Sequence, residues 1–248
     1  MIDRISSISS AGLLELIKKL PNQPMVQGML EQNNHGFLFS NKPERYVLIR
    51  NDGGYTFLAG HLENQDLNAV FNLLNSYEEI KLVCDESYHN WFIERGYTIC
   101  PRIQLLYSGK ELKPTEHKSY IIQEINSLDI FKNCQWFDII SKCYGSAEVF
   151  LQNGFGYVLR NNDDSGEIIG EVYAAFLGGG FCEVGITTHP DYQGQGVATN
   201  IACYLIIRCI RDNLIPIWSC NYENLGSLKV ALKVGFVINR YYAFLKKQ

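Results

Sequence analysis

Two glutamines and two glycines alternate at the point where a strand-like segment leads into a long apolar helix. They are Gln193, Gly194, Gln195 and Gly196, within the stretch GITTHPDYQGQGVATNIACYLIIRCI, residues 185–210. The first turn of the predicted helix, QGVAT, contains no acidic and no bulky side chain. Unpaired backbone N–H groups at the positive end of the helix dipole therefore stay accessible to an anion. This spacing predicts a phosphate-binding loop.

Two common phosphate-binding loops do not fit this stretch, and a third does. The dinucleotide fingerprint needs a third glycine where Thr199 stands, and the mononucleotide loop needs a GK[ST] ending that the sequence lacks. The hexapeptide QGQGVA, residues 193–198, resembles the [QR]-x-x-G-x-[GA] element of the GNAT (Gcn5-related N-acetyltransferase) superfamily. The later stretch NYENLGSLKVALKVGF resembles the superfamily's next helix, with Asn224 and Ser227 at its N-x-x-[SA] positions.

This resemblance covers the chain from Tyr120 to the C-terminus and implies that acetyl-CoA is the acyl donor. In the superfamily, the loop surrounds the pyrophosphate, and backbone groups of the preceding strand pair with the pantetheine arm and the thioester carbonyl. Carried over to this sequence, the implied cofactor-binding residues are Ile186, Thr187, Thr188, Gln193, Gly194, Gln195, Gly196, Val197, Ala198, Thr199, Asn224 and Ser227.

Glu183 is the catalytic residue that the resemblance implies. It lies on the strand before the loop, where related enzymes often carry a carboxylate that accepts the amine proton directly or through water. The alternative is a solvated strand carboxylate or a salt-bridge partner. His189, beside the loop, is interpreted as a turn residue, with a contact to pantetheine or substrate as the alternative.

The general acid departs from the superfamily pattern. A Tyr often stands four residues after the Ser/Ala of the second element, and this chain has Ala231 there. A thiol with a pKa near 8.5 can leave without full protonation, so the change does not forbid catalysis. Tyr222, Tyr241 and Tyr242 are substitutes to weigh against ordinary packing roles, and Cys220 is interpreted as a core residue because no motif places a His beside it.

The function predicted from these motifs is an acetyl-CoA-dependent N-acetyltransferase that acts on a primary amine of a small molecule or a peptide. The alternative is a non-catalytic acyl-CoA-binding regulatory module, because the usual Tyr is missing. A third hypothesis is a fold kept only for dimerisation. The identity of the acceptor and the formation of a homodimer are left open.

Composition narrows the class of protein. The chain has 248 residues, 46% of them hydrophobic, and a net charge of −4, which gives no basic excess for nucleic acid or anionic lipid. It has no apolar run of the ~20 residues that a membrane span needs, and its N-terminus lacks the apolar core of a secretory signal. We therefore expect a soluble, cytoplasmic protein without nucleic-acid or membrane partners.

The cysteines and histidines predict no metal site. The eight cysteines include no CxxC pair and mostly stand inside apolar segments, as expected of buried reduced thiols. The five histidines are scattered and do not combine with cysteines at zinc-ligand spacings.

The apolar periodicity predicts an α/β (α+β) protein: a mixed, mostly antiparallel GNAT-type sheet flanked by helices, preceded by a smaller α/β domain. Helices are expected over 11–20, 24–32, 66–75, 87–95, 128–144, from 195 onward and over 224–233. Strands are expected over 36–40, 45–50, 55–60, 80–84, up to 107, and over 120–125, 155–160, 168–177, 181–188, 215–220 and after 235.

A polar segment divides the chain into two predicted domains, residues 1–112 and 118–248. The segment, residues 108–119, contains Gly and Pro and has no apolar periodicity. The stretches WFIERGYTI and ALKVGFVIN, near the ends of the two halves, resemble each other as a helix end, a Gly, an aromatic residue and a strand. The first half is therefore interpreted as a degenerate GNAT-like copy of the second, with chance similarity as the alternative.

Overall fold

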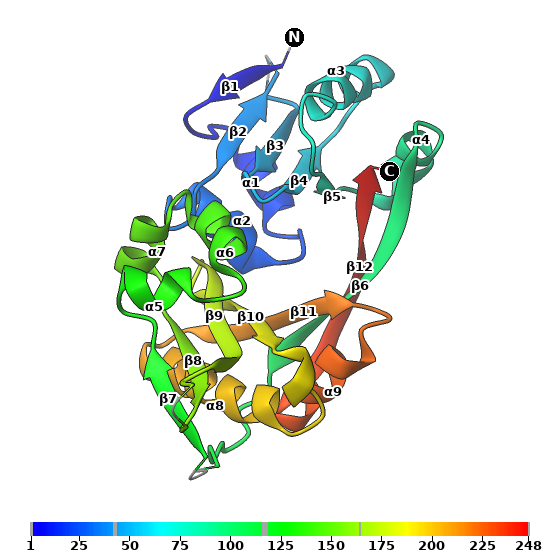
Figure 1. Cartoon of the computed structure of the whole chain (residues 1–248). Helices are drawn as coiled ribbons and strands as arrows, with labels where there is room; N and C mark the ends of the chain where they lie inside the picture. The colour runs from blue at the N-terminus through cyan, green and yellow to red at the C-terminus, as the bar shows by residue number, and fades with distance from the viewer. Residues whose placement is uncertain (1, 42–43, 116–118, 164, 248) are drawn as a thin grey trace.

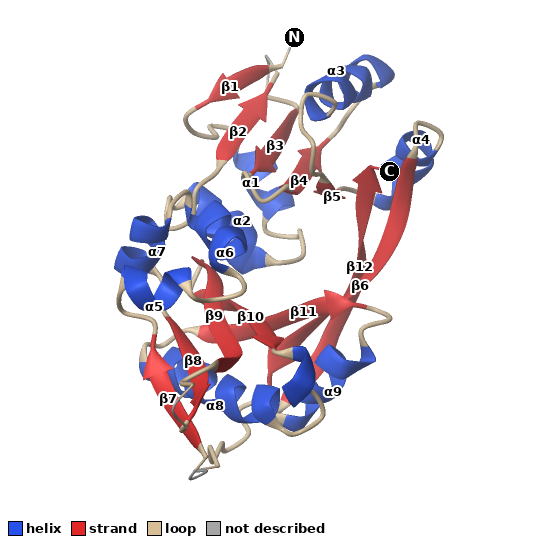
Figure 2. Cartoon of the chain, in the orientation of Figure 1, coloured by secondary structure: helices blue, strands red, loops and turns tan. Residues whose placement is uncertain are grey.

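The computed structural model describes residues 2–41, 44–115, 119–163 and 165–247. Within them the strands join into one twelve-stranded sheet with helices against it (Figures 1 and 2). The strands are β1 (Asp3–Ile5), β2 (Phe37–Ser40), β3 (Tyr46–Arg50), β4 (Tyr55–Gly60), β5 (Lys81–Val83), β6 (Tyr97–Tyr107), β7 (Tyr120–Glu124), β8 (Gly156–Asn161), β9 (Ile168–Gly178), β10 (Phe181–Thr188), β11 (Ile215–Asn221) and β12 (Phe236–Lys247). The helices are α1 (Ala11–Ile17), α2 (Gln23–Leu30), α3 (Asn64–Leu74), α4 (His89–Ile93), α5 (Leu128–Lys132), α6 (Phe137–Tyr144), α7 (Ala147–Asn153), α8 (Val197–Arg211) and α9 (Leu225–Lys233), with short 3-10 turns η1 (Glu86–Tyr88) and η2 (Pro190–Tyr192).

The strand order is β1-β2-β3-β4-β5-β12-β6-β11-β10-β9-β8-β7. From either edge, five strands of one half follow in chain order, and the last strand of the other half comes sixth. Each half begins with four antiparallel strands, followed by a helix and a strand parallel to the fourth, β5 beside β4 and β11 beside β10. The last strand of each half then pairs inside the other half. β6 lies between β11 and β12, and β12 lies between β5 and β6.

This arrangement agrees with the predicted fold class and with the resemblance between the stretches WFIERGYTI and ALKVGFVIN. Gly96 and Gly235 stand just before β6 and β12 with φ angles of +89° and +95°, which a Gly adopts without strain. The aromatic residues that follow them, Tyr97 and Phe236, begin the two exchanged strands. The long β6 and β12 pair runs between the two halves in Figure 1.

Three apolar cores support the sheet. One core, which includes Leu205 and Trp218, lies under α8 and α9, and another, which includes Val70 and Phe92, lies under α3 and α4. The third combines residues of α1, α2, α6 and α7 with inward-facing residues of strands from both halves. The two halves therefore share a core as well as a sheet, and α2 of the first half packs against β9 and β10 of the second.

The helix predicted over residues 128–144 is wrong as a single element. It is divided into α5 and α6, because the N–H groups of Gln135 and Trp136 donate to the buried carboxylate of Glu171 on β9, at 2.5 and 3.2 Å. The sequence also did not indicate β1 or α7. The helix expected from Gln195 begins at Val197.

The proposed division into two domains stays a prediction. Residues 108–115 of the predicted linker form no helix or strand, and residues 116–118, including His117, lie outside the described residues. However, β6 belongs to residues 1–112 and pairs with two strands of residues 118–248. None of the described helices combines the length and the apolar character that crossing a membrane requires.

Candidate active site

The sheet splits between β10 and β11 at Glu183. Only Phe181, Cys182 and Glu183 of β10 pair with β11, whereas the strand continues to Thr188 paired with β9. β11 meanwhile pairs with β6 through Asn221. A register shift in the β9–β10 ladder follows Glu183, because a bulge on β9 leaves Ala175 without a partner in the ladder. Beyond Glu183, the side of β10 that faces β11 therefore has backbone groups without a strand partner.

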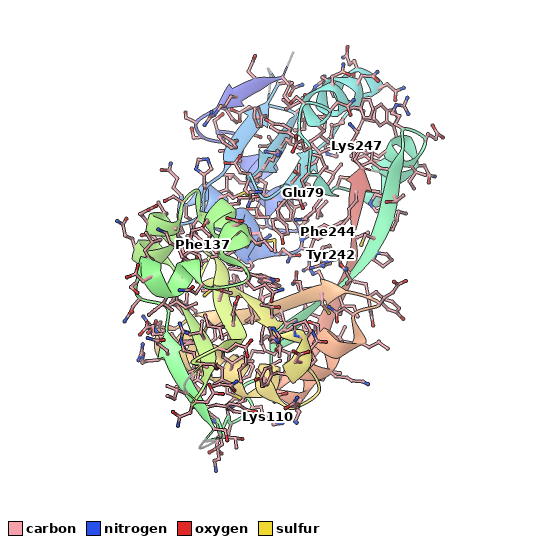
Figure 3. All side chains as sticks on the ribbon, viewed as in Figure 1. Glu79, Lys110, Phe137, Tyr242, Phe244 and Lys247 are labelled. Atoms are coloured by element: carbon pink, nitrogen blue, oxygen red, sulfur yellow. The ribbon has the colours of Figure 1, made fainter. Side chains whose placement is uncertain are left out.

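A cavity of about 720 Å³ occupies this split. It is lined by the end of β10, by the loop before α8, by the end of β11 and by α9. Residues of the first half also line it, namely Met25, Tyr55 and Arg102. In Figure 3, the labelled Tyr242 and Phe244 on β12 lie where the two halves face each other. The cavity is thus built by both halves of the chain.

The loop before α8 has the geometry of an anion cradle. Gly194 and Gly196 have φ angles of +75° and +86°, and a Cβ on either would meet no atom within 4 Å, so the surface above them is open. The Asn200 N–H donates to the Gly196 carbonyl at 3.0 Å, which leaves the N–H groups of residues 197–199 without an intrahelical partner. No acidic residue lies in this first turn. These N–H groups suit a phosphate.

The two glutamines of the loop brace it. Gln193 Nε2 donates to the Thr188 carbonyl at 3.4 Å, and Gln195 Nε2 donates to the Asp191 carbonyl at 2.8 Å. Gln193 lines the 720 Å³ cavity, whereas Gln195 lines a second cavity of about 400 Å³ on the other side of the α8 N-terminus.

Asn224 and Ser227 hold the first turn of α9. Asn224 is the N-cap residue, and its Oδ1 accepts the Ser227 N–H at 3.0 Å, which explains the spacing of three residues. Ser227 Oγ accepts a hydrogen bond from Trp218 Nε1 at 2.9 Å and so ties α9 to β11. Both residues line the cavity, together with Ile186, Thr187 and Thr188 of β10.

Glu183 is buried, with 4% of its surface exposed, yet it lines the cavity. Burial raises the pKa of its carboxyl to about 8, against the lowering effects of Ser219, Arg102 and Asn22. Its Oε2 atom has no hydrogen-bond partner among the described residues. A carboxyl in this state is matched to proton transfer near neutral pH, and the alternative of a solvated strand carboxylate does not fit its burial.

The first half contributes a polar residue close to Glu183. Asn22, in the left-handed conformation before α2, is fully buried and donates from Nδ2 to Ser219 Oγ at 2.9 Å. Its N–H donates to Gln104 Oε1 on β6 at 2.7 Å. Its Oδ1 has no hydrogen-bond partner among the described residues.

The sequence reasoning did not find Asn22, Arg102 or Ser219. The strand PRIQLLY does carry a signal, because Arg102 and Gln104 are two residues apart in an otherwise apolar run and must share one face. Ser219 is marked in the same way by the apolar residues around it in IPIWSC. The position of Asn22 has no comparable signal, because it depends on how α2 packs against the other half.

The residues considered as a general acid or a nucleophile differ in their burial and in their contacts. Ala231 is fully buried in the core under α8 and α9. Tyr222 and Tyr241 are 54% and 62% exposed, while Tyr242 accepts a hydrogen bond from Arg102 Nε at 3.2 Å. Burial raises the pKa of the Cys220 thiol, which disfavours the thiolate that a nucleophile needs. Tyr242 is therefore the tyrosine of the three that lies near the Glu183 end of the site.

His189 caps the turn η2, as expected of a turn residue. Its Nδ1 accepts the Asp191 N–H at 3.4 Å. Among the described residues, no group of three His, Cys, Asp or Glu side chains is arranged to hold a metal ion.

The chain matches known proteins along nearly its whole length. The family model for GNAT acetyltransferase matches residues 15–245. The chain belongs to the GNAT acetyltransferase family. GNAT character therefore extends over both halves, beyond the region from Tyr120 onward that the motifs marked. Membership in this family indicates acetyl transfer from an acyl-CoA donor.

Individual GNAT relatives are distant in sequence and similar in fold. The chain is 24% identical over 228 residues to the uncharacterized N-acetyltransferase YdfB of Bacillus subtilis (strain 168), covering 85% of each chain. It resembles the crystal structure of a GCN5-related N-acetyltransferase-like protein from Streptococcus suis 89/1591 with a TM-score of 0.78 and 20% identity, covering 95% of this chain and 97% of that one. It also resembles a tandem GNAT protein of the clavulanic acid biosynthesis pathway, with a TM-score of 0.61 and 11% identity, covering 99% and 98% of the two chains.

The two GNAT-like halves differ at the helix that follows their fourth strand. In the first half this helix is α3, whose N-terminus carries Glu63 and Asp66 in a reciprocal capping box. Two carboxylates at this end repel an anion and occupy the free N–H groups. The second half, with Gly194 and Gly196 at the same place, keeps its helix N-terminus open.

Proposed function

We propose that this protein is an acetyl-CoA-dependent N-acetyltransferase that transfers the acetyl group to a primary amine of a small molecule or a peptide. One observation carries the proposal. The buried Glu183 lies at the split between β10 and β11, in the same cavity as the open loop at Gly194 and Gly196. If Glu183 is the proton acceptor and the loop is the phosphate cradle, the two lie in one cavity, as acetyl transfer from acetyl-CoA requires.

The residues present fit acetyl-CoA, whose thioester supplies the acetyl group. The N–H groups of the loop and of residues 197–199 would hold the pyrophosphate. Backbone groups of the segment Ile186, Thr187 and Thr188 that point away from β9 would pair with the pantetheine arm and polarise the thioester carbonyl. Asn224 and Ser227 keep α9 in place on the opposite wall.

Glu183 would accept the proton of the attacking ammonium group. A carboxyl with a pKa of about 8 takes a proton from an amine more readily than one with an ordinary pKa of 4.5. A thiolate is a good enough leaving group to depart without a strong acid, so Ala231 does not prevent the reaction. Of the three tyrosines, Tyr242 is our proposed donor of a final proton, because it lies near Arg102 and Glu183.

The walls supplied by the first half favour a small acceptor. Met25, Tyr55 and Arg102 line the cavity from residues 1–112 and limit its size to about 720 Å³, which the acetyl donor must share. The acceptor in our proposal is therefore an amine of a small molecule or of a peptide. We propose separately that the protein is cytoplasmic. No comparison supports the alternative of a non-catalytic acyl-CoA-binding module.

The test is a pair of measurements on the full chain. Calorimetric titration with CoA and acetyl-CoA should show binding with a Kd on the order of micromolar. Release of CoA thiol in the presence of a broad panel of primary amines should then detect turnover. Glu183→Gln should lower kcat by roughly 10²-fold and leave the CoA affinity nearly unchanged.

The matched control is Glu94→Gln, at an exposed carboxylate that does not line the cavity. It should change neither measurement. Tight CoA binding without turnover of any amine would favour the binding module over the enzyme. If neither CoA nor acetyl-CoA binds, the enzymatic proposal fails altogether.

A further inference from the structure

Arg102 on β6 presents a cation to the cavity that contains Glu183. Its Nη1 donates to Asn221 Oδ1 at 2.6 Å and its Nε donates to the Tyr242 hydroxyl at 3.2 Å. The guanidinium carbon lies 4.7 Å from the centre of the Phe244 ring. These contacts fix the planar group in one orientation, as in a site that reads the geometry of a ligand.

Among the residues that the structure describes, this cation has no acidic partner. Ion pairs form at other arginines, but within the described ranges no carboxylate oxygen lies within 4.0 Å of an Arg102 nitrogen. The groups that act on it electrostatically are Tyr242, Tyr55 and Glu183. Burial raises the pKa of both tyrosines, so they stay neutral near neutral pH. Glu183, which must ionise to act as the base, forms no ion pair with Arg102 among the described residues. An unpaired cation at a partly dry site favours an anionic ligand.

Strand register places Arg102 and Glu183 on one face of the sheet. Glu183 is level with Ile217, and Arg102 is level with Asn221, four residues further along β11. Side chains an even number of residues apart point to the same side of a strand. The offset is about 13 Å along the strand, and the long Arg side chain spans part of it. An acceptor amine near Glu183 can therefore carry a second group that reaches Arg102.

We infer that the acceptor carries a carboxylate beside its amine, and that Arg102 binds this carboxylate and selects the acceptor. The substrate class is thus amino acids and related amino carboxylates. This inference rests on the proposed N-acetyltransferase function. Arg102 acts here as a specificity-determining residue, with Asn221 and Tyr242 as the residues that orient it.

The experiment compares acceptors that differ only in the carboxylate. The pairs are L-alanine with ethylamine, L-lysine with cadaverine, and L-phenylalanine with phenethylamine. The kcat/KM of the amino acid should exceed that of its decarboxylated partner by about 10-fold or more in at least one pair, because hydrogen bonds to charged groups are stronger than those between neutral groups. Arg102→Met should bring this ratio close to one, and Arg102→Lys should give an intermediate ratio because Lys cannot form the planar two-point contact.

Arg95→Gln is the matched control, because Arg95 is exposed and stacks on Trp91 at 3.7 Å outside the cavity. It should keep the wild-type ratio. If Arg102→Met lowers kcat/KM equally for both members of every pair, Arg102 only supports the site and the inference is overturned. Equal rates for both members in the wild type overturn it as well, while leaving the acetyltransferase proposal intact.

A binding measurement keeps the inference testable if no amine is turned over. Protein saturated with CoA is titrated with L-lysine and with cadaverine, for the wild type and for Arg102→Met. Tighter binding of L-lysine to the wild type alone supports the carboxylate site even when the proposed function fails. Indistinguishable binding of the two probes to the wild type contradicts it.

Discussion

At the scale of the residue, the burial of Glu183 is what supports the proposal that its carboxyl is functional. Spacing along β10 only marked its position, and the same spacing fits a surface salt bridge. Its 4% exposure, its pKa of about 8 and its unsatisfied Oε2 are the features that favour proton transfer. Such a carboxyl does not stabilise the fold, because a buried group without full hydrogen bonding destabilises the native state.

The raised pKa of Glu183 predicts how stability depends on pH. The pKa is about 8 in the folded state and 4.5 in the unfolded chain, so the folded state binds the proton more tightly. Its contribution to stability is complete below pH 4.5 and is lost as the pH rises through 8. The glutamine of Glu183→Gln is neutral at every pH. Between pH 5 and pH 9 the free energy of unfolding of this variant should therefore rise relative to that of the wild type. The rise should reach up to a few kcal/mol, at about 1.4 kcal/mol per pKa unit.

Urea unfolding at a series of pH values measures this difference. Other titrating groups are common to both proteins and cancel in the comparison, and Glu94→Gln should follow the wild type. Parallel curves for wild type and Glu183→Gln would show that the carboxyl titrates normally in the fold.

At the scale of the element, we propose that the start of α8 binds the cofactor. Gly196 has a φ of +86° and open space where a Cβ would stand. Gly196→Glu should therefore abolish CoA binding, because it strains the backbone of the cradle and places a carboxylate where phosphate must approach. The expected loss is at least about 100-fold in Kd, measured by calorimetry.

Gly96→Glu is the matched control for this change. Gly96 has a φ of +89° and equally open surroundings, but it lies at the turn before β6, away from the cavity. The two variants should lose similar stability, and only Gly196→Glu should lose CoA. Normal CoA binding by Gly196→Glu would mean that the pyrophosphate lies elsewhere.

At the scale of the whole molecule, the exchanged strands join the two halves. β6 pairs with β11 and β12, and β12 also pairs with β5, so separation of the halves leaves long unpaired edges. We expect fragments 1–112 and 118–248 to be insoluble or unfolded when expressed separately, and to form a stable one-to-one complex when co-expressed. Size-exclusion chromatography and thermal unfolding test this.

The intact chain serves as the reference, and it should unfold in a single transition. If fragment 118–248 alone is folded and binds CoA, the strand exchange is dispensable, and the division into two domains predicted from the sequence is the better description. The same result would also separate the cofactor site from the acceptor walls that Tyr55 and Arg102 provide.

Much of the local geometry at the proposed cofactor end of the site was predictable because its determinants are local in sequence. The left-handed glycines at positions 194 and 196 and the N-cap pair Asn224 and Ser227 act within one turn of their own helices. Helix and strand periodicity likewise predicted most elements, since each pattern reports which side of its own segment is buried. The sequence therefore determined the fold class, the family motifs and the position of Glu183 on its strand.

The acceptor end was decided by tertiary structure. The break between α5 and α6 depends on Glu171, a carboxylate from another element, and no local signal marks it. Arg102 lines the cavity and Asn22 contacts Ser219 of β11 only because β6 inserts beside β11 and α2 packs across the two halves. Pairing between strands distant in sequence depends on which buried surfaces complement each other. The periodicity of a single segment does not predict its pairing partner.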